Sequence, residues 1–177
     1  MLLRTFITLL FLTASASAYA SQVPYELTPY ASTLGRAQTN KDGETSFSGS
    51  IEITGKLHVI RSDDGTCKTA CAFFAPDRAS QARLPHRKLN SESIVYAADS
   101  IDLGEAGPIL ARAIGKKPAD RILRSNLPVY VVPATITLSK LLVYVACDAA
   151  HYSAHVASVR INQRLATYSR KAEAGGC

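Results

Sequence analysis

The stretch FSGSIEITGKLHVIR, residues 47–61, decides the fold. It is rich in Ile and contains Val and Thr, as β-strands are. Its apolar residues recur at even spacings: Ile51, Ile53, Leu57 and Val59. This alternation is typical of a strand with one buried face. Gly55 near the middle predicts a bulge or a coil that lets so long a strand bend.

Two more strands are predicted downstream of this one. Residues 62–66, with their Asp-Asp-Gly sequence, predict a turn, and residues 69–75 resume as a strand. A polar loop over residues 76–88 follows, with one helical turn predicted over residues 77–83. Residues 93–98 predict the third strand.

The hydrophobic period then changes from that of a strand to that of a helix. Four apolar residues fit one helix face: Ile109, Leu110, Ala113 and Ile114. Gly115 would end this helix, and Pro118 would begin a second short one. In the second helix we expect two apolar residues to face inward and two basic residues to face outward: Ile122 and Leu123, and Arg121 and Arg124.

Two β-rich segments follow the helices, at residues 127–138 and 141–146, with a turn predicted at Ser139-Lys140. Residues 147–161 are ambiguous. A helix would place Cys147, His151 and His155 on one face, but the outer two would lie about 12 Å apart along its axis. A strand is favoured by its β-branched residues Val156, Val159 and Ile161. His151 and His155 would then be roughly 13 Å apart, too far to share one metal ion.

The predicted order is three strands, helix, two strands, which is the order of the OB-fold, a five-stranded barrel. We therefore expect a mainly β protein with one or two short helices, forming an OB-like barrel whose helix lies between strands three and four. The predicted organisation is a signal peptide (1–20), an irregular N-terminal arm (21–45), an OB-like domain (46–161) and a basic C-terminal tail (162–177).

Several segments together resemble small exported bacterial OB-fold-like proteins of unassigned function. They are residues 47–57, CAFFAPD at 71–77 with Leu-Pro-His at 84–86, Cys147-Asp148, and residues 152–159. The resemblance covers roughly residues 47–161. It implies the fold and an exported location, and it brings no catalytic residues.

The N-terminus predicts export. Arg4 is a short basic region, residues 6–12 are a compact apolar run, and Ala18-Tyr19-Ala20 fits a signal-peptidase cleavage site. Removing residues 1–20 leaves 157 residues and lowers the net charge from +6 to +5. We expect a periplasmic or secreted protein without a membrane-spanning segment.

The four cysteines all follow the predicted cleavage site: Cys67, Cys71, Cys147 and Cys177. An even count in an exported chain predicts disulfide bonds, and four cysteines allow three pairings. OB topology would bring the loop after the first strand near the start of the fifth. We therefore favour Cys147 bonded to Cys67 or Cys71, with the other joined to Cys177. A Cys67–Cys71 bond would need a tight turn, because two residues four apart in a strand are too distant.

The chain has no recognisable catalytic motif, phosphate-binding loop or dinucleotide-binding motif, and we predict no cofactor and no metal. Phe73, Phe74 and Tyr96 could offer aromatic platforms to a nucleic acid, but export and the low aromatic content argue against that partner. The basic surface suits a protein or an anionic component of the envelope.

The sequence thus predicts an exported, non-enzymatic binding protein of the bacterial cell envelope, of inhibitor or immunity type. The predicted ligand contacts, at the loops flanking the barrel mouth, are Arg61, Lys68 and Tyr152. The alternative is a metal-binding protein or enzyme centred on Cys147, His151 and His155.

Overall fold

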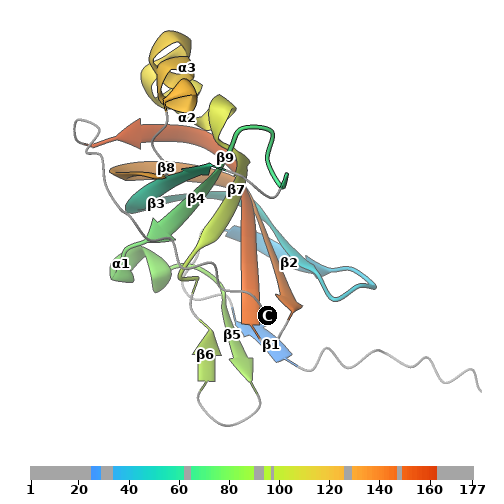
Figure 1. Ribbon diagram of the computed structural model, residues 1–177. Coiled ribbons are helices and arrows are strands. Elements are labelled where there is room, and N and C mark those ends of the chain that lie inside the picture. The colour runs from blue at the N-terminus through green and yellow to red at the C-terminus, as the bar shows by residue number, and fades with distance from the viewer. Residues whose placement is uncertain are drawn as a thin grey trace, which may run out of the picture.

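The computed structural model describes residues 25–28, 34–61, 65–89, 94–96, 98–125, 129–146 and 149–162. Five strands close a barrel in the order β3 (Thr45–Arg61), β4 (Ala70–Pro76), β7 (Ile101–Glu105), β9 (Ala149–Ile161) and β8 (Val129–Ala146), and β8 pairs back onto β3 (Figure 1). Pairing is antiparallel around the barrel except between β7 and β9, which are parallel. The mainly β, OB-like barrel predicted from the sequence is confirmed.

Two short helices connect the third and fourth barrel strands, as predicted. They are α2 (Ala106–Ile114) and α3 (Lys116–Arg124), and they lie together at one end of the barrel (Figure 1). Gly115 alone separates them, with a φ of 85° that favours glycine. None of the helices in the described part of the chain has the length and apolar character needed to cross a bilayer.

The long strand β3 carries the centre of the core. Its inward residues are almost fully buried, as their alternation predicts: Phe47, Ile51, Ile53, Leu57 and Val59. The predicted bulge is displaced, because the register shift in β3 falls between Ser48 and Ile51 rather than at Gly55. Glycine is required at position 55 because β4 passes too close to leave room for a side chain. A Cβ there would collide with the carbonyl oxygen of Ala75 and lie 2.8 Å from the Cα of Pro76.

A third, one-turn helix, α1 (Arg78–Gln81), follows β4 where one turn was predicted. Asp77 caps it, because its carboxylate accepts a hydrogen bond of 2.8 Å from the backbone N–H of Ser80. The same carboxylate accepts from the hydroxyl of Thr54 on β3. These hydrogen bonds hold the pKa of Asp77 below its usual value.

The turn predicted at Ser139-Lys140 is wrong. Residues 129–146 form one strand, and the register of its pairing with β9 shifts between Thr137 and Leu138 and again between Leu138 and Lys140. These irregularities let the 18-residue strand bend around the barrel. A bend within one strand and a turn between two strands both contain polar residues such as Ser139 and Lys140. The sequence pattern therefore does not distinguish between them.

The third barrel strand was predicted at residues 93–98 and instead lies at β7. Residues 94–96 form β6 (Ile94–Tyr96) in a separate sheet with β1 (Tyr25–Thr28) and β5 (His86–Leu89). The stretch at 21–45, predicted to be irregular, contains β1 and also β2 (Leu34–Thr39), which pairs with β3. The predicted signal peptide lies outside the described residues, as does the predicted tail beyond Asn162.

The described part of the ambiguous stretch at 147–161 is a strand, as favoured. Residues 149–161 form β9, and Tyr152, Ala154, Val156 and Val159 point into the core. This strand closes the barrel between β7 and β8, so choosing strand over helix here determines the fold.

The favoured disulfide pairing is wrong, because Cys67 is bonded to Cys71. Cys67 lies in a run of bends at residues 65–69 rather than in strand β4, so the two Cα atoms are only 5.5 Å apart. The assumed adjacency of the two loops also fails. The β3–β8 ladder runs from Thr45 opposite Val143 to Ile60 opposite Val129, so the loop after β3 and the β8–β9 turn lie at opposite ends of it. Cys147 and Cys177 lie outside the described residues.

Candidate functional site

Arg61, predicted to contact a ligand, stabilises the end of helix α3. One guanidinium nitrogen donates to the carbonyl oxygens of Leu123 and Ser125, at 3.3 and 3.2 Å. These carbonyls lie at the C-terminus of the helix, where a cation also interacts favourably with the helix dipole. Arg61 therefore already serves the fold, although it remains exposed at the surface.

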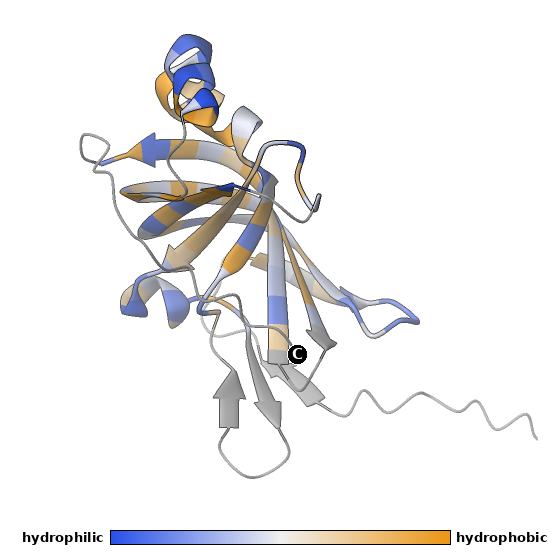
Figure 2. Cartoon of the chain, viewed as in Figure 1, coloured by the Kyte–Doolittle hydropathy of each residue, from blue (hydrophilic) through white to orange (hydrophobic). Residues whose placement is uncertain are grey.

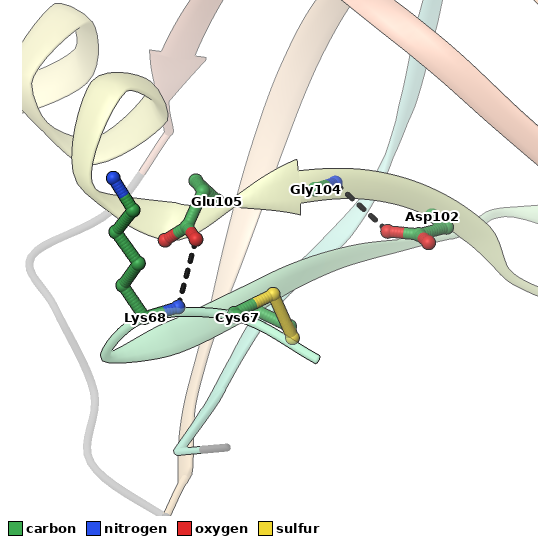
Figure 3. The surroundings of a disulfide bond; sticks show 6 residues. Cys67, Lys68, Asp102, Gly104 and Glu105 are labelled. Atoms are coloured by element: carbon green, nitrogen blue, oxygen red, sulfur yellow. Dashed lines mark hydrogen bonds between the residues drawn. A yellow bond between two sulfur atoms is a disulfide. The ribbon is translucent and has the colours of Figure 1, made fainter. Parts of the chain in front are cut away.

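Lys68 lies in the disulfide-bonded loop before β4 and is exposed. Its backbone N–H donates to a carboxylate oxygen of Glu105 at 2.8 Å, and its side chain extends beside that carboxylate (Figure 3). Asp102 similarly accepts from the backbone N–H of Gly104 at 2.8 Å (Figure 3). Both acids thus fix the backbone next to the start of helix α2.

Tyr152 is a core residue. Its side chain is 3% exposed and its hydroxyl donates to the carbonyl oxygen of Pro85 at 3.0 Å. On β9 it pairs with Ile101 and with Val143, which faces the start of β3. Arg61 lies at the other end of β3. The three predicted ligand residues are therefore not brought together on one surface, and their contact with a ligand stays a prediction.

The histidines of β9 lie on the outer face of the β8–β9 hairpin. The ring of His151 stacks on that of Tyr144, with centroids 5.0 Å apart and an interplanar angle of 15°. His155 is exposed and lies opposite Lys140. The two histidines are four residues apart on one strand, roughly 13 Å, which is too far for one ion. Within the described part of the chain, no three His, Cys, Asp or Glu side chains form a cluster that could hold a metal.

A groove opens where β7 and β9 part. The two strands pair only at Ile101 with Tyr152 and at Asp102 with Ser153. Beyond this point the barrel leaves a groove of about 460 Å³. It is bordered by β7, α2, the middle of β8 and β9, through Leu103, Glu105, Pro108, Ile109, Arg112, Ser139, Ala154, His155 and Val156.

Two side chains satisfy the backbone of β9 along this groove. Arg112 on α2 donates to the carbonyl oxygen of Val156, on the side of β9 where a neighbouring strand would otherwise pair. Ser139, at the bulge of β8, donates to the carbonyl oxygen of His155 at 3.4 Å. The groove thus holds hydrogen-bond donors of three kinds, guanidinium, hydroxyl and imidazole. Glu105 adds a carboxylate acceptor.

The groove combines an apolar floor with a polar rim. Val156 and Ile109 are buried, whereas Glu105, Arg112 and His155 are exposed. A mixture of this kind is typical of sites that bind a ligand by shape and a few oriented polar groups. Sequence reasoning missed these residues, except for His155. The groove is formed by the divergence of two strands, for which the sequence offers no local pattern.

His58 occupies an unusual position on the outer face of the barrel. It projects from β3 between the cross-strand neighbours Phe73 on β4 and Val131 on β8. Its Nε2 atom is buried and has no hydrogen-bond partner among the described residues. Burial, with a smaller contribution from the charge of Lys56, lowers the pKa of the imidazole.

No protein family, curated protein or solved structure matches this chain. The arguments that follow rest on its own residues.

Proposed function

We propose that this chain is an exported, non-enzymatic binding protein of the bacterial cell envelope, of inhibitor or immunity type, and that its groove between β7, α2 and β9 holds a segment of a partner protein. The observation that carries the proposal is the early parting of β7 and β9. It leaves an apolar floor and a half-paired strand at the surface of an otherwise closed barrel.

An extended polypeptide suits this groove. From Ala154 onward, β9 pairs with β8 on one side and, within the described residues, with no strand on the other. An extended segment can add to such an edge through backbone hydrogen bonds, while pockets select its side chains. Arg112 already donates a hydrogen bond to the carbonyl oxygen of Val156. We therefore expect the segment to lie against α2 rather than to pair with β9 along its full length.

The exported location is supported by two independent features. The first 20 residues have the order of a signal peptide, basic, apolar and then small residues. The Cys67–Cys71 bond is of a kind that persists in oxidising compartments. A small protein stabilised in this way, whose sequence has no recognisable catalytic motif, fits a role in binding.

The test compares capture of envelope proteins by the wild type and by Pro108→Glu/His155→Glu. Both positions are exposed and border the groove, so the acids change its rim without disturbing the core. The matched control is Gln38→Glu/Ala79→Glu, which adds the same charge at exposed positions on β2 and α1. We expect the groove variant to lose a partner that the wild type and the control retain, by about tenfold or more, or 1.4 kcal/mol. Equal capture by all three proteins would contradict the proposal.

A further inference from the structure

Helix α3 carries a stripe of like charge on its outer face. Lys117, Arg121 and Arg124 follow one another at spacings of four and three residues, and all three are exposed. At 3.6 residues per turn they fall within about 60° of the helix circumference. We call these three residues the basic stripe.

The charges of the basic stripe are not neutralised within the fold. The one acid of the helix, Asp120, forms an ion pair with Lys116 at 3.0 Å. Arg124 donates to the backbone carbonyl of Asp120, and no ion pair involves the stripe within the described residues. Like charges at these spacings destabilise a helix. Repulsion among three cations that form no ion pair with the described residues is expected where the charges serve a role outside the fold.

The opposite face of α3 is already used. Ala119 is buried, and Ile122 and Leu123 are half-buried against the core cluster. Arg61 fixes the end of the helix through the Leu123 and Ser125 carbonyls. The helix thus packs through Ala119, Ile122 and Leu123 and turns its charged side outward, where Pro118 is the one exposed apolar residue.

The position of α3 leaves the basic stripe exposed. The helix stands at the end of the barrel away from the sheet of β1, β5 and β6 (Figure 1), and it contains several strongly hydrophilic residues (Figure 2). It is a projection rather than a cleft. A protein interface of ordinary strength needs a desolvated centre with large apolar or aromatic anchors, which this projection lacks. A flat surface of uniform negative charge needs only a projecting cluster of cations.

We propose that the basic stripe docks the exported protein onto an anionic bilayer surface, with the barrel held above it. The contact is electrostatic and reversible, since nothing on α3 penetrates the lipid. Each Lys or Arg close to such a surface contributes about fivefold in affinity, so the stripe contributes about 100-fold together. This docking is separate from the groove, and either proposal can fail without the other.

The test is sedimentation of the protein with lipid vesicles, using protein recovered after export so that residues 6–12 do not themselves bind lipid. One set of vesicles is pure phosphatidylcholine, and in the other about one lipid in three is phosphatidylglycerol. We expect binding to the anionic vesicles only, weakened as added salt shortens the screening length from about 10 Å at 0.1 M to about 3 Å at 1 M. The variant Lys117→Gln/Arg121→Gln/Arg124→Gln should bind about 100-fold more weakly.

The matched control is Lys41→Gln/Lys56→Gln/Arg78→Gln, which removes the same charge from exposed residues outside α3. It should bind like the wild type, and circular dichroism should show all three proteins folded. Equal weakening by the control would mean that net charge alone attracts the protein, and would overturn the proposal. Equal binding to both kinds of vesicle would also overturn it. Binding of polyglutamate through the stripe, without binding to anionic vesicles, would identify an acidic protein as the partner instead.

Discussion

Replacing Cys67 and Cys71 by alanine should destabilise the protein only moderately. The bond closes a very short loop, with a sequence separation of four residues. In the chain-entropy model, a loop of about five residues restricts the unfolded chain by about 7 cal/mol/K, or about 2 kcal/mol at 25 °C. A bond from either cysteine to Cys147 would close a loop of about 75 to 80 residues and contribute about 4.5 kcal/mol.

The loss in the free energy of unfolding expected from the double substitution therefore differs by about 2.5 kcal/mol between the two pairings. For a chain of this length the short-loop bond corresponds to a fall in Tm of about 4 to 8 °C. Urea denaturation of the wild type and of Cys67→Ala/Cys71→Ala measures the difference in the free energy of unfolding. The protein with Cys147→Ala is the control, because its Cys67–Cys71 bond should be intact.

Peptide mapping checks the pairing directly. Trypsin cleaves after Arg61, Lys68 and Arg78, so the bond should join the peptides 62–68 and 69–78. The linked pair should be recovered without reduction from both the wild type and the Cys147→Ala protein. A loss of 4 to 5 kcal/mol in the double variant, together with loss of the linked pair in Cys147→Ala, would refute the short-loop pairing.

Four further predictions concern single residues of the barrel and of the two helices beside it. Gly55→Ala should cost about 3 kcal/mol or more in the free energy of unfolding, because its Cβ meets the backbone of β4. Gly107→Ala in α2, whose Cβ would lie 3.6 Å from Leu123, should instead stabilise by up to about 1 kcal/mol in the same urea assay. Because the pKa of His58 is lowered in the folded protein, the unfolded chain takes up a proton at this residue at a higher pH than the folded protein does. Stability should therefore fall as the pH drops below about 6.5, and His58→Leu should lose that part of the dependence. An unchanged pH profile in His58→Leu would contradict the assignment. Lys117→Glu should stabilise by about 0.5 to 1 kcal/mol, because it replaces a repulsion with Arg121 by an attraction four residues along the helix. A loss of stability would mean that Lys117 has a structural partner.

The strands with a buried face on one side were predictable from the sequence. In β3 the alternation of Ile51, Ile53, Leu57 and Val59 determines which face is buried, and burial in the structure follows it. The pair of helices was also predictable, because Gly115 and Pro118 mark a boundary that apolar periodicity alone does not. In β9, β-branched residues outweighed the helix-forming alanines.

Features that depend on pairing between distant segments were not predictable. Residues 94–96 have strand composition, but whether they join the barrel or pair with β5 depends on contacts that no local pattern shows. The pairing of Cys67 was misjudged because residues 65–69 bend rather than extend. The groove arises from the same kind of long-range geometry, since it exists only because β7 and β9 part after two residue pairs.

The most direct test of the central claim, that the groove binds a partner protein, is photo-crosslinking in the cells that export this chain. A photoreactive amino acid replaces Pro108, which is exposed at the groove, and in a second protein it replaces Gln38 on β2, outside the groove. We predict a discrete crosslinked product from position 108 that contains one partner protein and is absent from position 38. Products of the same size from both positions, or none from position 108, would contradict the account.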